Sequence, residues 1–376
     1  MIKPADFCAV LESCDFDFFT GVPDSLLKDL LAYITTHYPD DAHVIAANEG
    51  NAVALASGHY LATGKPAVVY MQNSGIGNAV NPLLSLADEL VYSIPMLLII
   101  GWSGEPGKKR DEPQHAKQGE VTLALLEAMG IEYELLNSES TNFDSKVVEV
   151  VSRMNNSSRP VSLVISAGTF EGFELGVSSE SIFEMSREDA IERIVEHLSS
   201  NDLVVSTTGM ASRELFECRE RLGLGHEADF LTVGSMGHCS QIALGLAMGL
   251  KDRRVICIDG DGAALMHMGS MAITASIGPS NYLHIVINNG AHDSVGGQPT
   301  VGRHLGFAAI ATANGYVEAD SVETLDQLND VLEARFAGRG PSLIEIKVRS
   351  GARADLGRPT ATPIENKNIF MENARK

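Results

Sequence analysis

Short apolar runs of strand length alternate along the chain with longer amphipathic stretches of helix length. In the first half these runs predict strands at 17–20, 43–47, 67–71, 96–101, 132–136 and 161–166. Patterns of helical period lie between them, at 25–35, 50–62 and 78–90. Alternation of this kind is typical of βαβ units, whose strands form a parallel sheet.

The pattern breaks at residues 167–185, where Gly, Ser and Glu are mixed without a clear period. After this segment the alternation resumes and predicts strands at 203–206, 230–233, 255–259, 283–288 and 342–348. We therefore predict an α/β fold of two doubly wound parallel-sheet domains, at 1–168 and 187–376, joined by a linker at 169–186. The tail after Arg353 is polar and interrupted by proline, so we expect it to be irregular.

Charge and apolar content exclude two classes of partner. The chain has 28 Lys and Arg against 49 Asp and Glu, a formal net charge of −21. Nucleic acids and anionic membranes attract clustered positive charge. The longest apolar run, at 95–101, is far too short to span a membrane, and the N-terminus lacks the apolar core of a signal peptide. We expect a cytoplasmic enzyme that binds neither nucleic acid nor membranes.

The five cysteines are scattered and form no CxxC pair. No cluster of His and Cys has the spacing of a zinc site along the chain. The spacing therefore predicts neither a disulfide framework nor a structural zinc.

Two glycine loops follow predicted strands. The first, Gly75-Ile76-Gly77, suggests dinucleotide binding, but Val80 stands where the third glycine of that motif belongs. The second, Gly260-Asp261-Gly262, places an aspartate directly after a buried strand. The next strand ends in Asn288-Asn289. Carboxylate and amide oxygens suit Mg²⁺, which usually also binds phosphate oxygens, although either cluster taken alone is an ordinary turn sequence.

The Gly260-Asp261-Gly262 loop, followed at this spacing by Asn288-Asn289, resembles the cofactor motif of thiamin-diphosphate-dependent 2-oxo acid decarboxylases. The resemblance implies that the cofactors are thiamin diphosphate and Mg²⁺. It also implies a pyrimidine-binding first domain, a diphosphate-binding second domain and no middle domain. The implied metal ligands are Asp261, Asn289 and the main-chain oxygen of Ala291. The implied diphosphate-binding residues are Gly260, Gly262, Ala263, Ala264, Thr208 and Gly209.

Glu49 is the only carboxylate between Asp41 and Asp88, and it lies in an apolar segment. Burial there would raise its pKa and keep a proton on it. The alternative is a glutamate placed near a helix start by the helix dipole. The resemblance gives Glu49 the role of the acid that hydrogen-bonds the pyrimidine N1′. It further places Gln72, Asn73, the carbonyl of Gly234 and the side chain of Met236 around the cofactor.

The resemblance extends over further stretches, among them GVPDSLL, NEGNAVALASG and GWSGEPGKKRDEPQHAKQG. It therefore implies a substrate as well. That substrate is phosphonopyruvate, decarboxylated to phosphonoacetaldehyde and CO₂ in phosphonate metabolism. Sulfopyruvate or another small 2-oxo acid is the alternative. The family also implies a homodimer or larger homo-oligomer with active sites at subunit interfaces.

Two residues are candidates for proton transfer, Asp24 after a strand end and His115 in a loop predicted at 104–119. The alternative for Asp24 is an ordinary turn residue, and the alternative for His115 is a solvated loop histidine. Candidate contacts to the substrate are Lys108, Lys109, Arg110, Lys117, Arg213, His292 and Asp293.

Two other functional classes stay open. A non-catalytic regulatory or scaffold protein on the same fold would be expected to lose Glu49 or a metal ligand, and neither is lost. A nicotinamide-dependent oxidoreductase is disfavoured by the absent third glycine.

Overall fold

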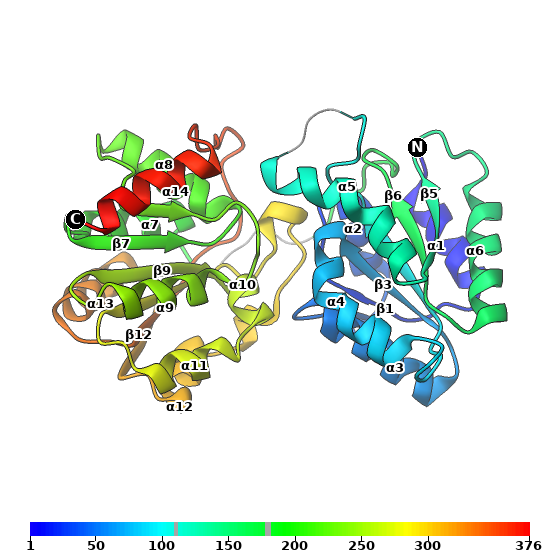
Figure 1. Ribbon diagram of the computed structural model, residues 1–376, viewed down its shortest axis with the longest axis horizontal. Helices are drawn as coiled ribbons and strands as arrows, with labels where there is room; N and C mark the ends of the chain where they lie inside the picture. Colours follow the sequence, from blue (N-terminus) through cyan, green and yellow to red (C-terminus); the bar gives the residue numbers. More distant parts are fainter. Residues whose placement is uncertain (109–111, 177–181) are drawn as a thin grey trace. The chain divides into compact units, whose positions relative to one another are not determined.

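The computed structural model describes residues 1–108, 112–176 and 182–376 (Figure 1). The chain divides into two compact units, Met1–Ser178 and Ser179–Lys376. No helix in the described ranges is both long and apolar enough to cross a membrane.

The first unit is a six-stranded parallel sheet with strand order β2-β1-β3-β4-β6-β5. Its strands are β1 (Phe19–Gly21), β2 (His43–Ile45), β3 (Ala67–Gln72), β4 (Met96–Gly101), β5 (Glu132–Leu136) and β6 (Val161–Ile165). Its helices are α1 (Pro4–Ser13), α2 (Lys28–His37), α3 (Glu49–Thr63), α4 (Ile76–Pro82), α5 (Pro113–Ala128) and α6 (Phe143–Ser157).

The second unit is a second six-stranded parallel sheet, with strand order β11-β12-β10-β9-β7-β8. Its strands are β7 (Asp202–Ser206), β8 (Asp229–Leu231), β9 (Arg254–Gly260), β10 (Tyr282–Asn288), β11 (Glu318–Val322) and β12 (Ser342–Lys347). Its helices are α7 (Arg187–His197), α8 (Met210–Arg221), α9 (Cys239–Gly249), α10 (Asp261–Met266), α11 (Ser270–Ile277), α12 (Phe307–Asn314), α13 (Leu325–Ala337) and α14 (Pro363–Ala374).

The central strands are apolar because both faces of each sheet are covered by helices (Figure 1). Every residue of β4 is buried, and so is every residue of β10. On β3, Val68 and Tyr70 pack into one core, whereas Val69 and Met71 pack into the core on the opposite face. This two-residue alternation places an apolar core on each side of the sheet. The predicted α/β class with two parallel-sheet domains is confirmed.

Two local predictions were wrong, and one strand was missed. The tail after Arg353 is not irregular throughout, because α14 begins after a capping box formed by Thr362 and Glu365. His115 lies in α5 and not in a loop, because Pro113 occupies the first helical turn, where proline is favoured. The strand β11 was missed because its sequence, Glu-Ala-Asp-Ser-Val, is polar and lies at the edge of the sheet.

Candidate active site

A cavity of about 90 Å³, open to solvent, lies in the second unit where β9 and β10 end. Ligands of open α/β sheets bind at this carboxyl edge. The predicted residues Thr208, Met236, Gly260, Asp261, Gly262, Ala263, Asn289 and Ala291 line it, as do His292 and Asp293. Within the part of the chain that the structure describes, Gly209, Gly234 and Ala264 are not among the lining residues. Gly209 nevertheless lies against this region, since a Cβ built on it would lie 3.5 Å from Ser294 Oγ.

Asp261 is the first residue of α10, and its side chain is 2% exposed. The Thr300 hydroxyl donates a hydrogen bond to its Oδ2 atom. Burial raises the pKa of Asp261 to about 6, although the hydrogen bonds from Thr300 and the Gly262 amide act in the opposite direction. Within the described ranges, no lysine or arginine forms an ion pair with this carboxylate. The positive charge of Arg303 also acts on this carboxylate, but together these groups do not offset the cost of burying it.

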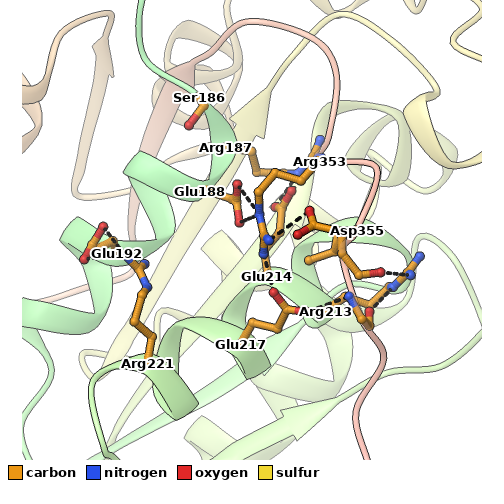
Figure 2. Close-up of polar contacts among 12 residues, drawn as sticks. Ser186, Arg187, Glu188, Glu192, Arg213, Glu214, Glu217, Arg221, Arg353 and Asp355 are labelled. Atoms are coloured by element: carbon orange, nitrogen blue, oxygen red, sulfur yellow. Dashed lines mark hydrogen bonds and ion pairs between the residues drawn. The ribbon is translucent and has the colours of Figure 1, made fainter.

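Asn289 is held by Asp293, whose Oδ2 accepts a hydrogen bond of 2.7 Å from Asn289 Nδ2. The same carboxylate pairs with Arg187 Nη1 at 2.9 Å, and the Gly351 amide donates to it at 3.0 Å. Arg187 is fixed in turn by Glu214, with contacts of 2.6 and 2.9 Å (Figure 2). With its Nδ2 committed to Asp293, Asn289 has Oδ1 as its acceptor; this oxygen accepts a hydrogen bond of 3.3 Å from the Ala291 amide and has a second lone pair. No sequence motif marks this chain of contacts.

Two glycines let the backbone approach closely around the cavity. A Cβ on Gly262 would lie 3.0 Å from the His292 ring and 3.3 Å from Met236 Cε. Gly237 has a φ of +85°, and a Cβ there would lie 2.8 Å from both Met266 and the His267 ring. A side chain at either position would fill space beside the predicted diphosphate-binding residues and the side chain of Met236. Burial lowers the pKa of His292 to about 4, so its ring is neutral at physiological pH.

In the first unit, Glu49 is the first residue of α3, after the N-cap Asn48. Its side chain is 5% exposed, and its Oε2 accepts a hydrogen bond of 2.7 Å from Asn78 Nδ2. Gly75 packs against the carboxyl group so closely that a Cβ there would overlap it. Burial raises the pKa of Glu49, partly opposed by Asn78. The structure thus provides the buried acid that the sequence predicts.

Asp24 and Gln72 meet near the ends of β1 and β3. Gln72 Nε2 donates to Asp24 Oδ1 at 3.1 Å and to Ser103 Oγ at 3.2 Å. Burial raises the pKa of Asp24 to about 6, while Gln72 and the nearby charge of His115 lower it. The first turn of α5 thus brings His115 into electrostatic contact with Asp24, although the loop predicted for it was wrong.

Asn73, predicted to lie near the cofactor, is 1% exposed and is anchored inside the unit. Its Nδ2 donates to the Ser103 carbonyl at 2.8 Å and to Thr122 Oγ1 at 2.9 Å. These contacts join the turn after β3 to the loop after β4 and to α5. They support the position of Gln72 and Asp24, and any cofactor contact by the Asn73 side chain has to come from its remaining oxygen.

Comparison with known proteins agrees with this geometry. Residues 5–131 match the thiamine pyrophosphate enzyme, N-terminal TPP binding domain, and residues 207–346 match the corresponding C-terminal TPP binding domain. The chain is 33% identical to "phosphonopyruvate decarboxylase" of Streptomyces viridochromogenes, over 97% of this chain and 93% of the relative. The protein of the same name from Streptomyces hygroscopicus is also 33% identical, over 100% and 94%. "Sulfopyruvate decarboxylase" of Methanosarcina acetivorans is 27% identical, over 91% and 90%.

The chain belongs to the thiamine pyrophosphate enzymes. Within them it is a decarboxylase of the phosphonopyruvate and sulfopyruvate type. The two matched domains coincide with the two units of this decarboxylase, and no middle domain separates them. The predicted family, fold and class of enzyme, a carboxy-lyase, are confirmed.

Most of the cations that were candidates for substrate binding in the decarboxylase have other partners or lie outside the cavity. Arg213 donates to the carbonyls of Leu356 and Gly357, each at 2.6 Å, and so anchors the segment before α14 (Figure 2). Lys117 is exposed on α5 and pairs with Glu120 at 3.0 Å. Lys108 is exposed, and Lys109 and Arg110 lie outside the described residues.

Several residues of the decarboxylase site escaped the sequence analysis because their roles depend on tertiary contacts. Arg303 donates to the carbonyls of Asn288 and Asn289, at 3.2 and 2.8 Å, and so binds the end of β10. No local motif marks it. A signal did exist for Asn78. It is a polar residue six positions after Gln72, in the helix that follows β3. The remaining residues of this kind are Thr300, Arg187 and Glu214.

Proposed function

We propose that this enzyme converts phosphonopyruvate to phosphonoacetaldehyde and CO₂, using thiamin diphosphate and Mg²⁺. The observation that carries the proposal is the sequence identity of 33% to two phosphonopyruvate decarboxylases, across nearly the whole length of this chain. The sulfopyruvate decarboxylase is less similar, at 27%. Sulfopyruvate is the second candidate substrate, because it shares the tetrahedral anion next to a 2-oxo acid.

The residues of the second unit fit a divalent cation. Asp261 is a buried carboxylate with a raised pKa, and bound positive charge would relieve the cost of its ionisation. The proposed ligands are Asp261, the Oδ1 atom of Asn289 and the main-chain oxygen of Ala291. All three residues line the cavity, and oxygen donors of these kinds suit Mg²⁺. The proposed diphosphate-binding groups are the amides of Gly260–Ala264, together with Thr208 and Gly209, which follow β7.

Thiamin diphosphate, when bound, supplies the electron acceptor that decarboxylation of a 2-oxo acid requires. The proposed role of Glu49 is to keep a proton at Oε1 for the pyrimidine N1′, since Asn78 already occupies Oε2. Its raised pKa supports that role, because the protonated carboxyl is favoured in this buried position. The carbonyl of Gly234 and the side chain of Met236 are the proposed contacts on the other domain. Gln72 and Asn73 are the proposed pyrimidine-side neighbours.

The overall reaction breaks the bond between the carboxylate and the 2-oxo carbon, releases CO₂ and adds one proton in its place. Asp24 and His115 are the proposed residues for that proton. A pKa of about 6 lets Asp24 exchange a proton near neutral pH, and His115 is close enough to affect its charge. The cationic residues around His115, Lys108 to Arg110 and Lys117, are the proposed source of charge for the phosphonate.

The assembly is also part of the proposal. Glu49 and Asp261 belong to different units, and we propose that each active site forms where one subunit presents its first unit to the second unit of a neighbour. The active form would then be a homodimer or a larger homo-oligomer in the cytoplasm. The segment at 169–186 is the proposed linker between the two domains.

A comparison of kcat/KM for phosphonopyruvate, sulfopyruvate and pyruvate, with Mg²⁺ and thiamin diphosphate present, tests the substrate. We expect phosphonopyruvate to react fastest, because charge-assisted hydrogen bonds favour its dianionic group. Pyruvate should react slowest, since it leaves the cations without a partner. Lys108→Gln should narrow the preference, whereas Lys367→Gln, an exposed lysine on α14, should leave it unchanged. Faster turnover of sulfopyruvate would assign the second candidate.

A further inference from the structure

Four side chains with metal-binding atoms meet inside the second unit, behind the loop that carries Asp261. Cys257 and Asp259 lie on β9, two residues apart and therefore on the same face of the sheet. His284 is paired directly opposite Cys257 on β10. Cys239 is the first residue of α9, which packs on that face.

The donor atoms of this cluster are close together. Cys239 Sγ lies 3.4 Å from Cys257 Sγ, and both sulfur atoms lie within 4.8 Å of a carboxylate oxygen of Asp259. The Nε2 atom of His284 lies 3.5 Å from Asp259 Oδ2. The four residues are between 0 and 2% exposed, so solvent does not satisfy them.

Asp259 and His284 are buried with few polar partners. Among the described residues, Asp259 Oδ2 and His284 Nε2 face each other as an ion pair at 3.5 Å but form no hydrogen bond, and His284 Nδ1 forms none either. A buried polar group without a hydrogen bond costs roughly 1–3 kcal/mol, so this weakly satisfied pair needs an explanation. A cation bound beside Asp259 and the two sulfur atoms would give the carboxylate a close partner.

We propose that Cys239, Cys257 and Asp259 form a second metal site, for a thiophilic divalent cation of the zinc class, with His284 next to Asp259. Two thiolates and one carboxylate are donors that Zn²⁺ accepts, and thiolates select ions of this class. Mg²⁺ is a poor match, because it takes oxygen ligands and keeps bound water. The site is therefore chemically distinct from the oxygen-lined cavity at Asp261.

The ion would join the start of α9 to β9. Met236 comes three residues before Cys239, and Asp261 comes two residues after Asp259. The metal would thus fix the spacing between the two loops that carry the proposed cofactor contacts. Because the cluster is buried, the ion is expected to enter while the chain folds.

The test is to express the full-length protein in minimal medium supplemented with Zn²⁺ or with Co²⁺, and to purify it under reducing conditions. We expect about one Zn²⁺ per chain by elemental analysis. The cobalt form should show thiolate-to-cobalt charge transfer in the near ultraviolet and the visible bands of tetrahedral cobalt. Cobalt at the Asp261 cavity would have oxygen ligands and would lack the thiolate band.

The variants Cys239→Ser and Cys257→Ser should each lose the thiolate band and the stoichiometric metal. Cys218→Ser, a buried cysteine of the same unit outside the cluster, should keep both. Asp261→Ala should also keep both, which separates this site from the proposed cofactor site. Wild-type protein that contains no metal and shows no thiolate band after growth with either ion would overturn the proposal, even if a variant fails to fold. A thiolate band that persists in Cys239→Ser would overturn it as well.

Discussion

Glu49 and Asp261 occupy equivalent local positions in the two units. Each is the first residue of a helix that follows a strand of a parallel sheet, and each side chain is nearly buried. Burial raises the pKa of both. The surroundings differ, because an amide from Asn78 contacts Glu49, whereas the Thr300 hydroxyl and a backbone amide contact Asp261.

The same local design therefore serves two opposite requirements. For Glu49, a raised pKa is useful, because the proposed role needs a retained proton. For Asp261, a raised pKa is a cost, which a bound cation would remove by stabilising the charged form. Comparing the two shows that burial alone does not define a role. What decides it is the set of groups next to the carboxyl: the Asn78 amide and a backbone N–H at Glu49, or a cavity lined by further oxygen donors at Asp261.

The strongest test of this comparison is Asp261→Ala. It removes the proposed charged ligand, so we expect Mg²⁺-dependent binding of thiamin diphosphate to weaken by more than about 100-fold and activity to disappear. Isothermal titration of the cofactor, with and without Mg²⁺, measures this. The control is Asp320→Asn. Asp320 lies on the edge strand β11 and forms an ion pair with Arg335. Unchanged cofactor affinity in Asp261→Ala would refute the proposed ligand set.

The matching change in the other unit is Glu49→Gln. The amide keeps the shape and the contact with Asn78 but supplies no acidic proton, so kcat should fall by about 100-fold or more. Cofactor affinity should stay within about threefold, in contrast to Asp261→Ala. Parallel measurement of kcat and of cofactor binding in the two variants separates the roles. Near-normal turnover in Glu49→Gln would rule out the proposed acid.

Asp293→Asn should have a smaller effect on the cation site. Asp293 accepts the Asn289 Nδ2 hydrogen bond, and the variant lets that amide turn its oxygen away. Groups that orient metal ligands typically contribute about 10-fold or more to affinity, so the Mg²⁺ concentration for half-maximal activity should rise about 10-fold. The rate at saturating Mg²⁺ should recover most of its value. A loss of rate that added Mg²⁺ does not restore would instead place Asp293 at the substrate.

The sequence was sufficient for the fold where burial is complete. The central strands β3, β4, β9 and β10 have apolar runs that only a doubly covered parallel sheet explains. It was insufficient at the periphery, where β11 is a polar edge strand that no local pattern reveals. For α14 a signal was present in the Thr-Pro-Ile-Glu sequence that begins at Thr362, a capping box with proline in the first turn.

The site shows the same limit. Asp261 and Asn289 follow predicted strands, and the resemblance to the thiamin-diphosphate motif gave them and Glu49 their predicted roles. Their partners Asn78 and Thr300 were not assigned, and Asp293 was assigned to the substrate and not to Asn289, because each contact depends on how loops return to the sheet edge. The cysteine cluster is a stronger case. Cys239, Cys257 and His284 are far apart along the chain and have no zinc-like spacing, and only the pairing of β9 with β10 and the packing of α9 bring them together.

Asp24 is tested through stability and not through activity, because its carboxyl is fully buried and has a pKa of about 6. In the unfolded chain its pKa is near 3.8. Between these values the folded protein binds the additional proton, so this residue's contribution to stability falls as pH rises from about 4 to above 6. Asp24→Asn removes the ionisation and should stabilise the protein at pH 8 by up to about 3 kcal/mol relative to wild type.

Thermal unfolding of wild type and Asp24→Asn at about pH 4.5 and pH 8 tests this sign. The variant should gain more at pH 8, because only there is the wild-type carboxylate charged in the folded state. Asp88→Asn, at a half-buried turn where the Leu90 amide donates to Asp88, is the control for the substitution itself. If Asp24→Asn gives the same gain at both pH values, the Asp24 carboxyl is not held near a pKa of 6. In that case the proposed role of Asp24 in proton transfer near neutral pH loses its physical basis. The proposed role of Glu49, buried in the same unit, would be unaffected.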